Sequence, residues 1–261
     1  MSTPEYLALT TAWRLAYHRI PPQGDGASRP GLVFLGGFKS AMTGTKAVWL
    51  QQWAEARGLA YLRFDYRGHG ESSGAFEECV VGDWLADTLT AIRQLTDGPQ
   101  ILVGSSMGGW LALLAARQLR SRVAGLVGLA AAPDFVAESA RARLSGVEWQ
   151  VLQAEGRVEV PSANDEAPYV YTRRLFEEGR QHLVLDRPLR LDCPVRLLHG
   201  TADPDVNWQI SVRLLEHLAC PDARLTLIKG AGHRLSERAD LALIGRTLDE
   251  VYGSVAAGGL R

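Results

Sequence analysis

The segment Gly104-Ser105-Ser106-Met107-Gly108 constrains the fold of this chain more than any other stretch. An apolar run over residues 101–103 precedes it, and a proline-free, helix-forming run over 110–116 follows it. This order predicts a buried strand, a sharp turn and a helix. In such a turn a serine hydroxyl is held above the sheet edge, and the flanking glycines avoid clashes that a Cβ would cause. Ser106 is therefore the predicted nucleophile.

Short buried strands alternate with helices over most of the chain. We expect strands at 32–35, 60–64, 100–103, 123–130, 195–198 and 224–228, and helices at 45–57, 83–96, 207–219 and 237–252. Residues 13–20 alternate in polarity, which predicts an edge strand facing water, and the chain is expected to fray from Gly253 onwards. The alternation predicts an α/β fold, a mostly parallel sheet with helices on both faces. A length of 261 residues fits a single domain, 1–261.

The regular pattern stops at Pro133 and resumes after about residue 190. Between them the sequence is charged and irregular, with an expected helix at 135–145 and a hairpin-like stretch around Gly156. An aromatic and basic segment, 169–176, follows. We interpret 133–190 as a lid insertion. It follows strand 123–130, which is expected to be the sixth core strand.

Composition excludes several classes of partner. The 28 basic and 29 acidic residues nearly cancel, so no charge excess indicates nucleic acid. No apolar stretch is long enough to span a bilayer, and the first residues do not resemble a signal peptide. Three unpatterned cysteines suit free thiols, so a cytoplasmic protein is expected. Metal-binding and phosphate-loop motifs are missing, and we expect no metal and no cofactor. The expected partner is a small-molecule or acylated substrate, and the expected state a monomer or homodimer.

A serine nucleophile needs a base and an acid that orients the base. Asp203 follows strand 195–198, and His233 follows strand 224–228, so both are expected at the carboxyl edge of the sheet beside Ser106. The order serine, acid, histidine is the one found with this kind of turn. Asp134 and Asp205 remain alternative acids, ranked after Asp203.

Backbone donors should stabilise the oxyanion. We expect the N–H groups of Phe38 and Met107 to form this hole. His69 and His199 are interpreted as structural. Candidate substrate-binding residues are aromatic: Trp110, Tyr169, Tyr171 and Phe176. The last three line an acyl pocket or pack the lid onto the core, and packing is favoured. Arg173 and Arg174 are either solvated or contacts for an acidic head group.

At these residues the sequence resembles the α/β-hydrolase superfamily, over about residues 13–252. Segments 37–47, 63–74 and 98–110 are similar to the α/β-hydrolase-domain subfamily of mitochondrial palmitoyl-protein thioesterases and acyl-glucuronide esterases. The resemblance implies hydrolysis of thioesters or esters through an acyl-serine, with no cofactor. Gly36 stands where many hydrolases have histidine, which a backbone donor tolerates. No transit peptide is recognisable, so the mitochondrial location does not carry over.

Two other functions remain open from the sequence. The same fold serves peptidases of the iminopeptidase kind, which cleave Pro-arylamides. The second alternative is a binding protein with the hydrolase fold and no activity. The presence of Ser106, Asp203 and His233 together argues against it, because a binding protein would not need all three. Dehalogenases and epoxide hydrolases are disfavoured, because they carry aspartate at the position of Ser106.

Overall fold

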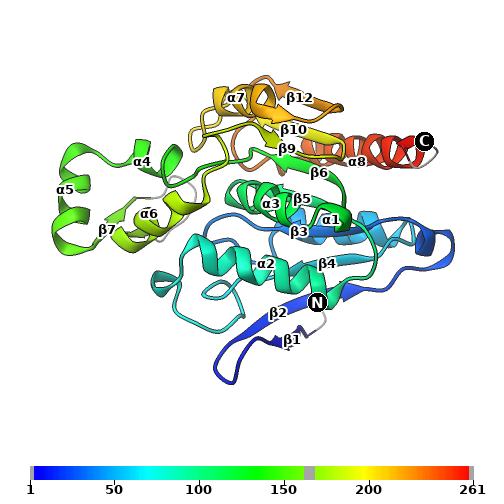
Figure 1. Cartoon of the computed structure of the whole chain (residues 1–261), viewed down its shortest axis with the longest axis horizontal. Coiled ribbons are helices and arrows are strands. Elements are labelled where there is room, and N and C mark those ends of the chain that lie inside the picture. Colours follow the sequence, from blue (N-terminus) through cyan, green and yellow to red (C-terminus); the bar gives the residue numbers. More distant parts are fainter. Residues whose placement is uncertain (1–2, 162–167, 259–261) are drawn as a thin grey trace.

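A single eight-stranded sheet forms the centre of the molecule (Figure 1). The computed structural model describes residues 3–161 and 168–258. In spatial order the strands are β1 (Glu5–Ala8), β2 (Arg14–Ile20), β4 (Tyr61–Phe64), β3 (Gly31–Leu35), β5 (Gln100–Ser105), β6 (Val123–Leu129), β10 (Val195–Gly200) and β12 (Ala223–Ile228). Pairing is antiparallel from β1 to β4 and parallel from β4 to β12, which confirms the mostly parallel α/β sheet.

The edge of the sheet differs from the prediction. Strand β1 pairs with the outer side of β2, from Glu5 opposite Tyr17 to Ala8 opposite Arg14. Residues 13–20 therefore do not form the edge strand, and Leu15, Ala16 and Tyr17 are buried in succession. The prediction failed because β1, four residues long and mostly exposed, carries little hydrophobic signal.

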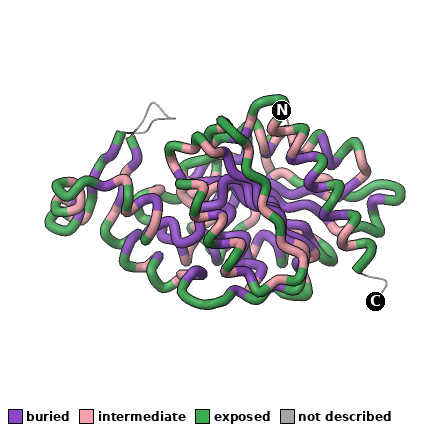
Figure 2. Tube along the Cα trace, turned by 90° about the horizontal axis from the view of Figure 1, so that it is seen from above, coloured by how far each residue is buried: buried purple, intermediate pink, exposed green. Residues whose placement is uncertain are grey.

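Helices cover both faces of the sheet, and each face has its own hydrophobic core (Figure 2). On β5, Leu102 packs into the core beneath α2 (Val81–Leu95) and α3 (Met107–Gln118). Its neighbours Ile101 and Val103 pack into the core beneath α1 (Thr45–Glu55) and α8 (Arg238–Gly258). Side chains alternate across a strand, so a strand buried on both faces reads as a continuous apolar run.

Helices α7 and α8 complete the carboxyl-terminal part. Helix α7 (Gln209–His217) packs against β10 and β12. Helix α8 continues to Gly258, so the expected fraying from Gly253 is wrong. Two short strands, β9 (Leu189–Arg190) and β11 (Leu218–Ala219), form a separate parallel pair. Single 3-10 turns lie at η1 (Gly24–Ser28), η2 (Phe76–Glu78), η3 (Arg120–Arg122) and η4 (Arg180–His182).

The helices of the segment 133–190 lie to one side of the sheet, at the left of Figure 1. The segment contains α4 (Ser139–Arg143), α5 (Gly146–Glu155), β7 (Arg157–Val160), β8 (Tyr169–Thr172) and α6 (Arg173–Gly179). Residues 162–167 of the predicted lid lie outside the described residues. The expected helix 135–145 is shorter than predicted, and α5 was not predicted. Gly156 ends α5 with φ 80°, and the antiparallel β7 and β8 follow it, which accounts for the hairpin-like signal there.

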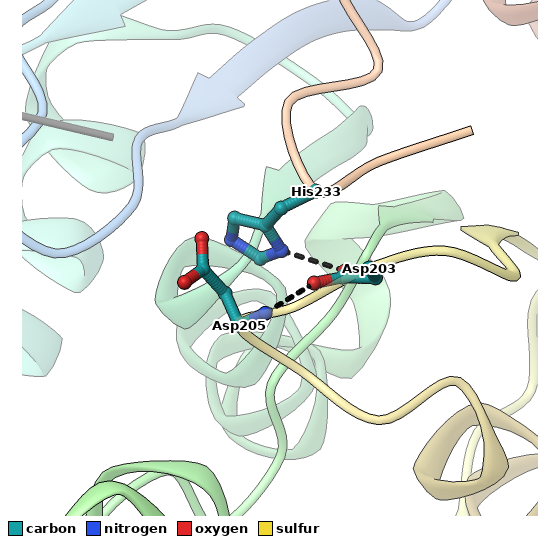
Figure 3. Close-up of side chains that lie close together, drawn as sticks. All are labelled: Asp203, Asp205 and His233. Atoms are coloured by element: carbon teal, nitrogen blue, oxygen red, sulfur yellow. Dashed lines mark hydrogen bonds and ion pairs between the residues drawn. The ribbon is translucent and has the colours of Figure 1, made fainter. Parts of the chain in front are cut away.

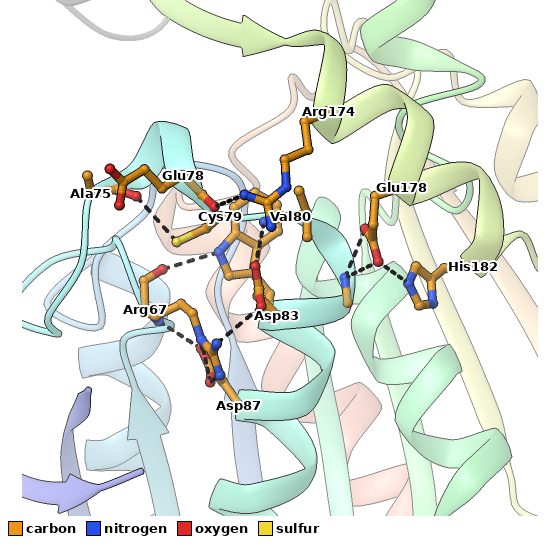
Figure 4. A network of polar contacts seen from close by, with 12 residues as sticks. Arg67, Ala75, Glu78, Cys79, Val80, Asp83, Asp87, Arg174, Glu178 and His182 are labelled. Atoms are coloured by element: carbon orange, nitrogen blue, oxygen red, sulfur yellow. Dashed lines mark hydrogen bonds and ion pairs between the residues drawn. The ribbon is translucent and has the colours of Figure 1, made fainter. Parts of the chain in front are cut away.

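Polar contacts hold α6 against the start of α2 (Figure 4). The Glu178 carboxylate accepts from the Gly82 N–H at 3.1 Å and is bonded to His182 Nε2 at 2.6 Å. Arg174 donates to the Glu78 carbonyl at 3.1 Å. Among the described residues, no helix combines the length and apolar character needed to cross a bilayer.

Candidate active site

Ser106 lies at the tip of the turn between β5 and α3, where the backbone itself fixes its position. Its φ of 55° is one that residues other than glycine rarely adopt. A Cβ on Gly104 would lie 2.3 Å from the Gly108 carbonyl oxygen, and one on Gly108 would lie 2.1 Å from the Leu35 carbonyl oxygen. Both contacts are with backbone that cannot move aside. Glycine at 104 and 108 is therefore required for β5, α3 and β3 to approach this closely.

The structure brings Ser106, His233 and Asp203 into one chain of hydrogen bonds. Ser106 Oγ lies 3.0 Å from His233 Nε2, and His233 Nδ1 lies 2.7 Å from Asp203 Oδ2. Asp203 follows β10 and His233 follows β12, which run parallel and end at the same edge of the sheet. Because the carboxylate only accepts, Nδ1 carries the proton and Nε2 faces the serine as an acceptor.

Asp203 is buried and accepts hydrogen bonds at both oxygens. Oδ1 accepts from the N–H groups of Asp205 and Val206, each at 2.8 Å. Oδ2 also contacts His199 Nε2 at 3.0 Å, in addition to His233. Burial alone would raise the pKa of Asp203, but hydrogen bonds from His199 and His233 hold it well below its ordinary value. Asp203 therefore stays ionised beside the imidazole.

Asp205 lies on the other side of His233 (Figure 3). One carboxylate oxygen each of Asp203 and Asp205 and one ring nitrogen of His233 lie within 4.8 Å of one another. Asp205 forms an ion pair with Arg143, and both oxygens of Asp203 already have partners. These contacts favour proton transfer at His233 over coordination of a metal ion.

The alternative acids occupy different positions. The Asp134 carboxylate accepts from the N–H groups of Val184 and Leu185, at 2.7 and 3.0 Å. Burial raises the pKa of Asp134. Its partners lie at the end of the insertion, and its role is to hold that end. Asp205 is close to His233 but is paired with Arg143, whereas Asp203 makes the hydrogen bond to Nδ1.

The two predicted oxyanion donors belong to backbone segments next to Ser106. Met107 is the first residue of α3, and Phe38 follows Gly37, whose added Cβ would lie 3.3 Å from Ser106 Cβ. Among the described residues, neither the Phe38 nor the Met107 N–H donates to a protein acceptor. His69 Nε2 accepts from the Lys39 N–H at 3.2 Å and so anchors the Phe38 loop. Burial lowers the pKa of His69 to about 4, which keeps this acceptor neutral.

A cavity of about 370 Å³ opens over Ser106 and His233. Tyr169, Tyr171 and the Phe38 ring line it, and Phe38 stacks against Tyr171 with ring centroids 5.6 Å apart. Two other predicted substrate contacts do not line it. Trp110 is fully buried and donates to the His182 carbonyl at 3.1 Å, and Phe176 packs against Trp149.

The charged residues at the cavity are mostly different from those expected. Arg173 and Arg174 lie outside the cavity and donate to the carbonyl groups of Gln153 and Glu78. The wall instead carries four basic residues and one acid: Lys39, Lys46, Arg143, Arg234 and Asp205. Lys46 donates to the Arg234 carbonyl, and burial together with the Arg234 charge lowers its pKa to about 8.

Sequence reasoning missed Arg143, and it gave His199 a structural role without identifying its contact with Asp203. His199 donates to Asp203, and its other nitrogen contacts Ser211 Oγ at 2.7 Å. The spacing of four residues between His199 and Asp203, at a strand end, was the signal available. Arg143 reaches Asp205 over 62 residues of sequence, and no local pattern indicates that contact.

The model of the alpha/beta hydrolase family matches residues 32–244. The chain belongs to the alpha/beta hydrolase family. Among curated relatives, the mitochondrial palmitoyl-protein thioesterase ABHD10 of Bos taurus is 38% identical over 243 residues. This match covers 93% of this chain and 78% of the relative. The predicted family and the prediction of a hydrolase are thereby confirmed, whereas the cytoplasmic location stays a prediction.

Solved structures of this alpha/beta hydrolase family agree with the fold. A putative hydrolase from Agrobacterium vitis S4 matches with a TM-score of 0.89 and 36% identity, covering 95% of this chain and 97% of that one. Alpha/beta hydrolase domain-containing protein 10 from mouse matches with a TM-score of 0.86 and 36% identity, covering 95% and 98%.

Proposed function

We propose that this alpha/beta hydrolase is a serine hydrolase that cleaves carboxylic esters or acyl thioesters through an acyl-serine. The observation that carries the proposal is the chain of hydrogen bonds from Ser106 through His233 to Asp203. Nε2 takes the proton of the Ser106 hydroxyl as its oxygen attacks the acyl carbon. Asp203 fixes the tautomer of the imidazole and stabilises the imidazolium that forms.

The proposed reaction then proceeds with the same groups. The N–H groups of Phe38 and Met107 stabilise the oxyanion of the tetrahedral intermediate. As the intermediate collapses, His233 gives its proton to the departing alcohol or thiol, and the acyl group stays on Ser106. A water molecule, deprotonated by His233, attacks the acyl-serine and releases the acid. No step needs a cofactor.

The segment 133–190 serves in this proposal as a lid that shapes the substrate cavity. It contributes Phe135, Arg143, Tyr169 and Tyr171 to the wall. The aromatic rings support an acyl group as one side of the substrate. The basic residues support a leaving group with negative charge, such as a uronate, and the name of the bovine relative supports a thioester.

The test is kcat/KM for p-nitrophenyl esters from acetate to palmitate, with Ser106→Ala beside the wild type. We expect Ser106→Ala to lose about 10⁴-fold or more. Ser254→Ala, on α8 and away from the cavity, is the matched control and should match the wild type. A fluorophosphonate that labels the wild type and not Ser106→Ala would identify the nucleophile. Absence of both turnover and labelling would overturn the proposal and favour the binding-protein alternative.

The leaving group is tested with a matched pair of substrates. A phenyl ester whose leaving group bears a carboxylate is compared with the same ester after methylation of that carboxylate. We expect the charged member to have the lower KM, and this preference to weaken as salt screens the charges. Turnover of Pro-arylamides in excess of either ester would instead support the iminopeptidase alternative.

A further inference from the structure

Asp205 places a second carboxylate beside His233, in addition to that of Asp203, and Arg143 pairs with it. We propose that Arg143 is a positioning residue that neutralises Asp205 and thereby sets the pH at which His233 becomes a base. This inference rests on the proposed roles of Ser106 and His233. The ion pair between Arg143 and Asp205, which joins the segment 133–190 to the loop after β10, would thereby affect the proposed reaction.

The geometry places a second carboxylate next to the imidazole. Asp205, Asp203 and His233 each offer one atom within 4.8 Å of the others. In Figure 3 the Asp205 carboxylate lies beside the ring, away from the hydrogen bond to Asp203. The Asp205 N–H donates to Asp203 Oδ1, so the backbone holds Asp205 in this position. The Asp205 side chain is only 6% exposed, and water screens its charge little.

A second carboxylate with no counter-charge beside an imidazole favours the protonated form of the ring. A charge within about 4–6 Å of a titratable group changes the balance between its two forms by about 1–3 pH units. Arg143 offsets this effect, because its guanidinium pairs directly with the Asp205 carboxylate. The guanidinium is itself held over the Tyr169 ring, 5.2 Å from the ring centroid.

Other charged groups also act on His233. Asp203 lies at Nδ1, with His199 behind it. From α1, Lys46 donates to the carbonyl of Arg234, the residue after His233, and Asp240 of α8 acts on Lys46. Lys39 and Tyr169 face the same cavity. The variants keep all of these groups, and the double variant separates the effect of the Arg143–Asp205 pair from the loss of the Arg143 contact with Tyr169.

The experiment measures kcat/KM against pH with one p-nitrophenyl ester. In Arg143→Met, Asp205 keeps its charge, and we expect the midpoint of the acidic limb to move up by about one pH unit. In Asp205→Asn, Arg143 keeps its charge, and the midpoint should move down. The double variant, Arg143→Met with Asp205→Asn, should return towards the wild type, and Arg143→Lys should stay close to it.

Shifts of opposite sign separate this proposal from a purely structural role, which would lower activity without moving the midpoint. Thermal unfolding of each variant identifies any that fails to fold, and the double variant and Arg143→Lys then supply the comparison. Midpoints that stay at the wild-type value, or shifts in the same direction, would overturn the inference. If Ser106→Ala keeps full activity, the proposed function fails instead, so the two failures are distinguishable.

Discussion

The turn around Ser106 and the segment 133–190 build the two sides of the same cavity by different means. At the turn, glycines 104 and 108 lie against backbone carbonyls, and the main chain fixes the position of Ser106. In the segment 133–190, the cavity wall is held by side chains, such as Arg143 on Asp205 and Glu178 on the Gly82 N–H.

This difference predicts different tolerance to substitution. A substitution at the turn displaces Ser106, the proposed nucleophile, because the backbone has no room to adjust. A substitution in the segment 133–190 changes the shape or charge of the wall and leaves the hydrogen bonds of Ser106 and His233 in place. Such a change should alter substrate preference or, at Arg143, pH dependence without abolishing the reaction.

The largest expected effect is on activity at His233. His233→Ala removes the proposed base, and we expect kcat/KM to fall by about 10⁴-fold. Urea denaturation should show a folded protein. His217→Ala, at the end of α7 and outside the cavity, is the control and should keep activity. Comparable activity in the two variants would contradict the assignment of His233.

A matched pair of glycines tests the difference in backbone packing. In Gly108→Ala the new Cβ meets two carbonyl oxygens at 2.1 and 2.4 Å, and we expect the free energy of unfolding to fall by about 1–3 kcal/mol. In Gly146→Ala, at the start of α5, the Cβ meets nothing within 4 Å. The second variant should stay within about 0.5 kcal/mol of the wild type. Equal losses would contradict the contrast between the two regions.

The contributions of two buried carboxylates to stability, Asp203 behind the site and Asp134 in the segment 133–190, should change with pH in opposite directions. The folded pKa of Asp203 is depressed, so its ionised form stabilises the fold above the ordinary aspartate pKa. Relative to Asp203→Asn, the wild type should lose this advantage as pH falls below about 4. Urea midpoints between neutral and acidic pH measure the difference.

Asp134, at the start of the segment 133–190, provides the comparison. Burial raises its folded pKa, so its contribution is fully present below the unfolded pKa and is lost as pH rises through the folded value. Relative to Asp134→Asn, the wild type should therefore gain stability on acidification. If the stability difference between wild type and variant changed with pH in the same direction for Asp203→Asn and Asp134→Asn, one of these assignments would be wrong.

The smallest effect is expected at Tyr171, whose buried hydroxyl makes no hydrogen bond to any other of the described residues. Tyr171→Phe removes an unsatisfied polar group, and we expect unfolding free energy to rise by about 1 kcal/mol. If the hydroxyl contacts substrate, KM rises in the same variant. Trp110→Phe provides the contrast, because it breaks the hydrogen bond to the His182 carbonyl and leaves a cavity in the core, and it should lose about 2–3 kcal/mol. A Tyr171→Phe protein less stable than the wild type would refute this account.

The sheet and the positions around Ser106 were predictable because their signals are local. Continuous apolar runs mark strands buried on both faces, and the glycines of the turn are required by contacts with backbone. The order of Ser106, Asp203 and His233 sufficed to predict that they meet, because parallel strands place their carboxyl ends at one edge.

The wall of the cavity was less predictable, because its contacts join residues far apart in sequence. Nothing near Arg143 indicates that it reaches Asp205, and nothing near Trp110 indicates that it is bonded to the His182 carbonyl instead of facing the cavity. Strand β1 was missed because it has only four residues, three of them exposed, and carries little hydrophobic pattern. The contacts of Arg143 and Trp110 depend on side-chain geometry in the folded protein, which sequence spacing does not reveal.

The order of the strands also has a consequence for biosynthesis. Asp203 and His233 come from the loops after β10 and β12, and β12 forms one edge of the sheet. A chain emerging from the ribosome therefore contains Ser106, the proposed nucleophile, well before it contains His233, the proposed base. Pairing across such long sequence separations is slow to form. Hydrolysis should thus begin only when β12 has joined β10, and the nascent chain is kept inactive until its fold is complete.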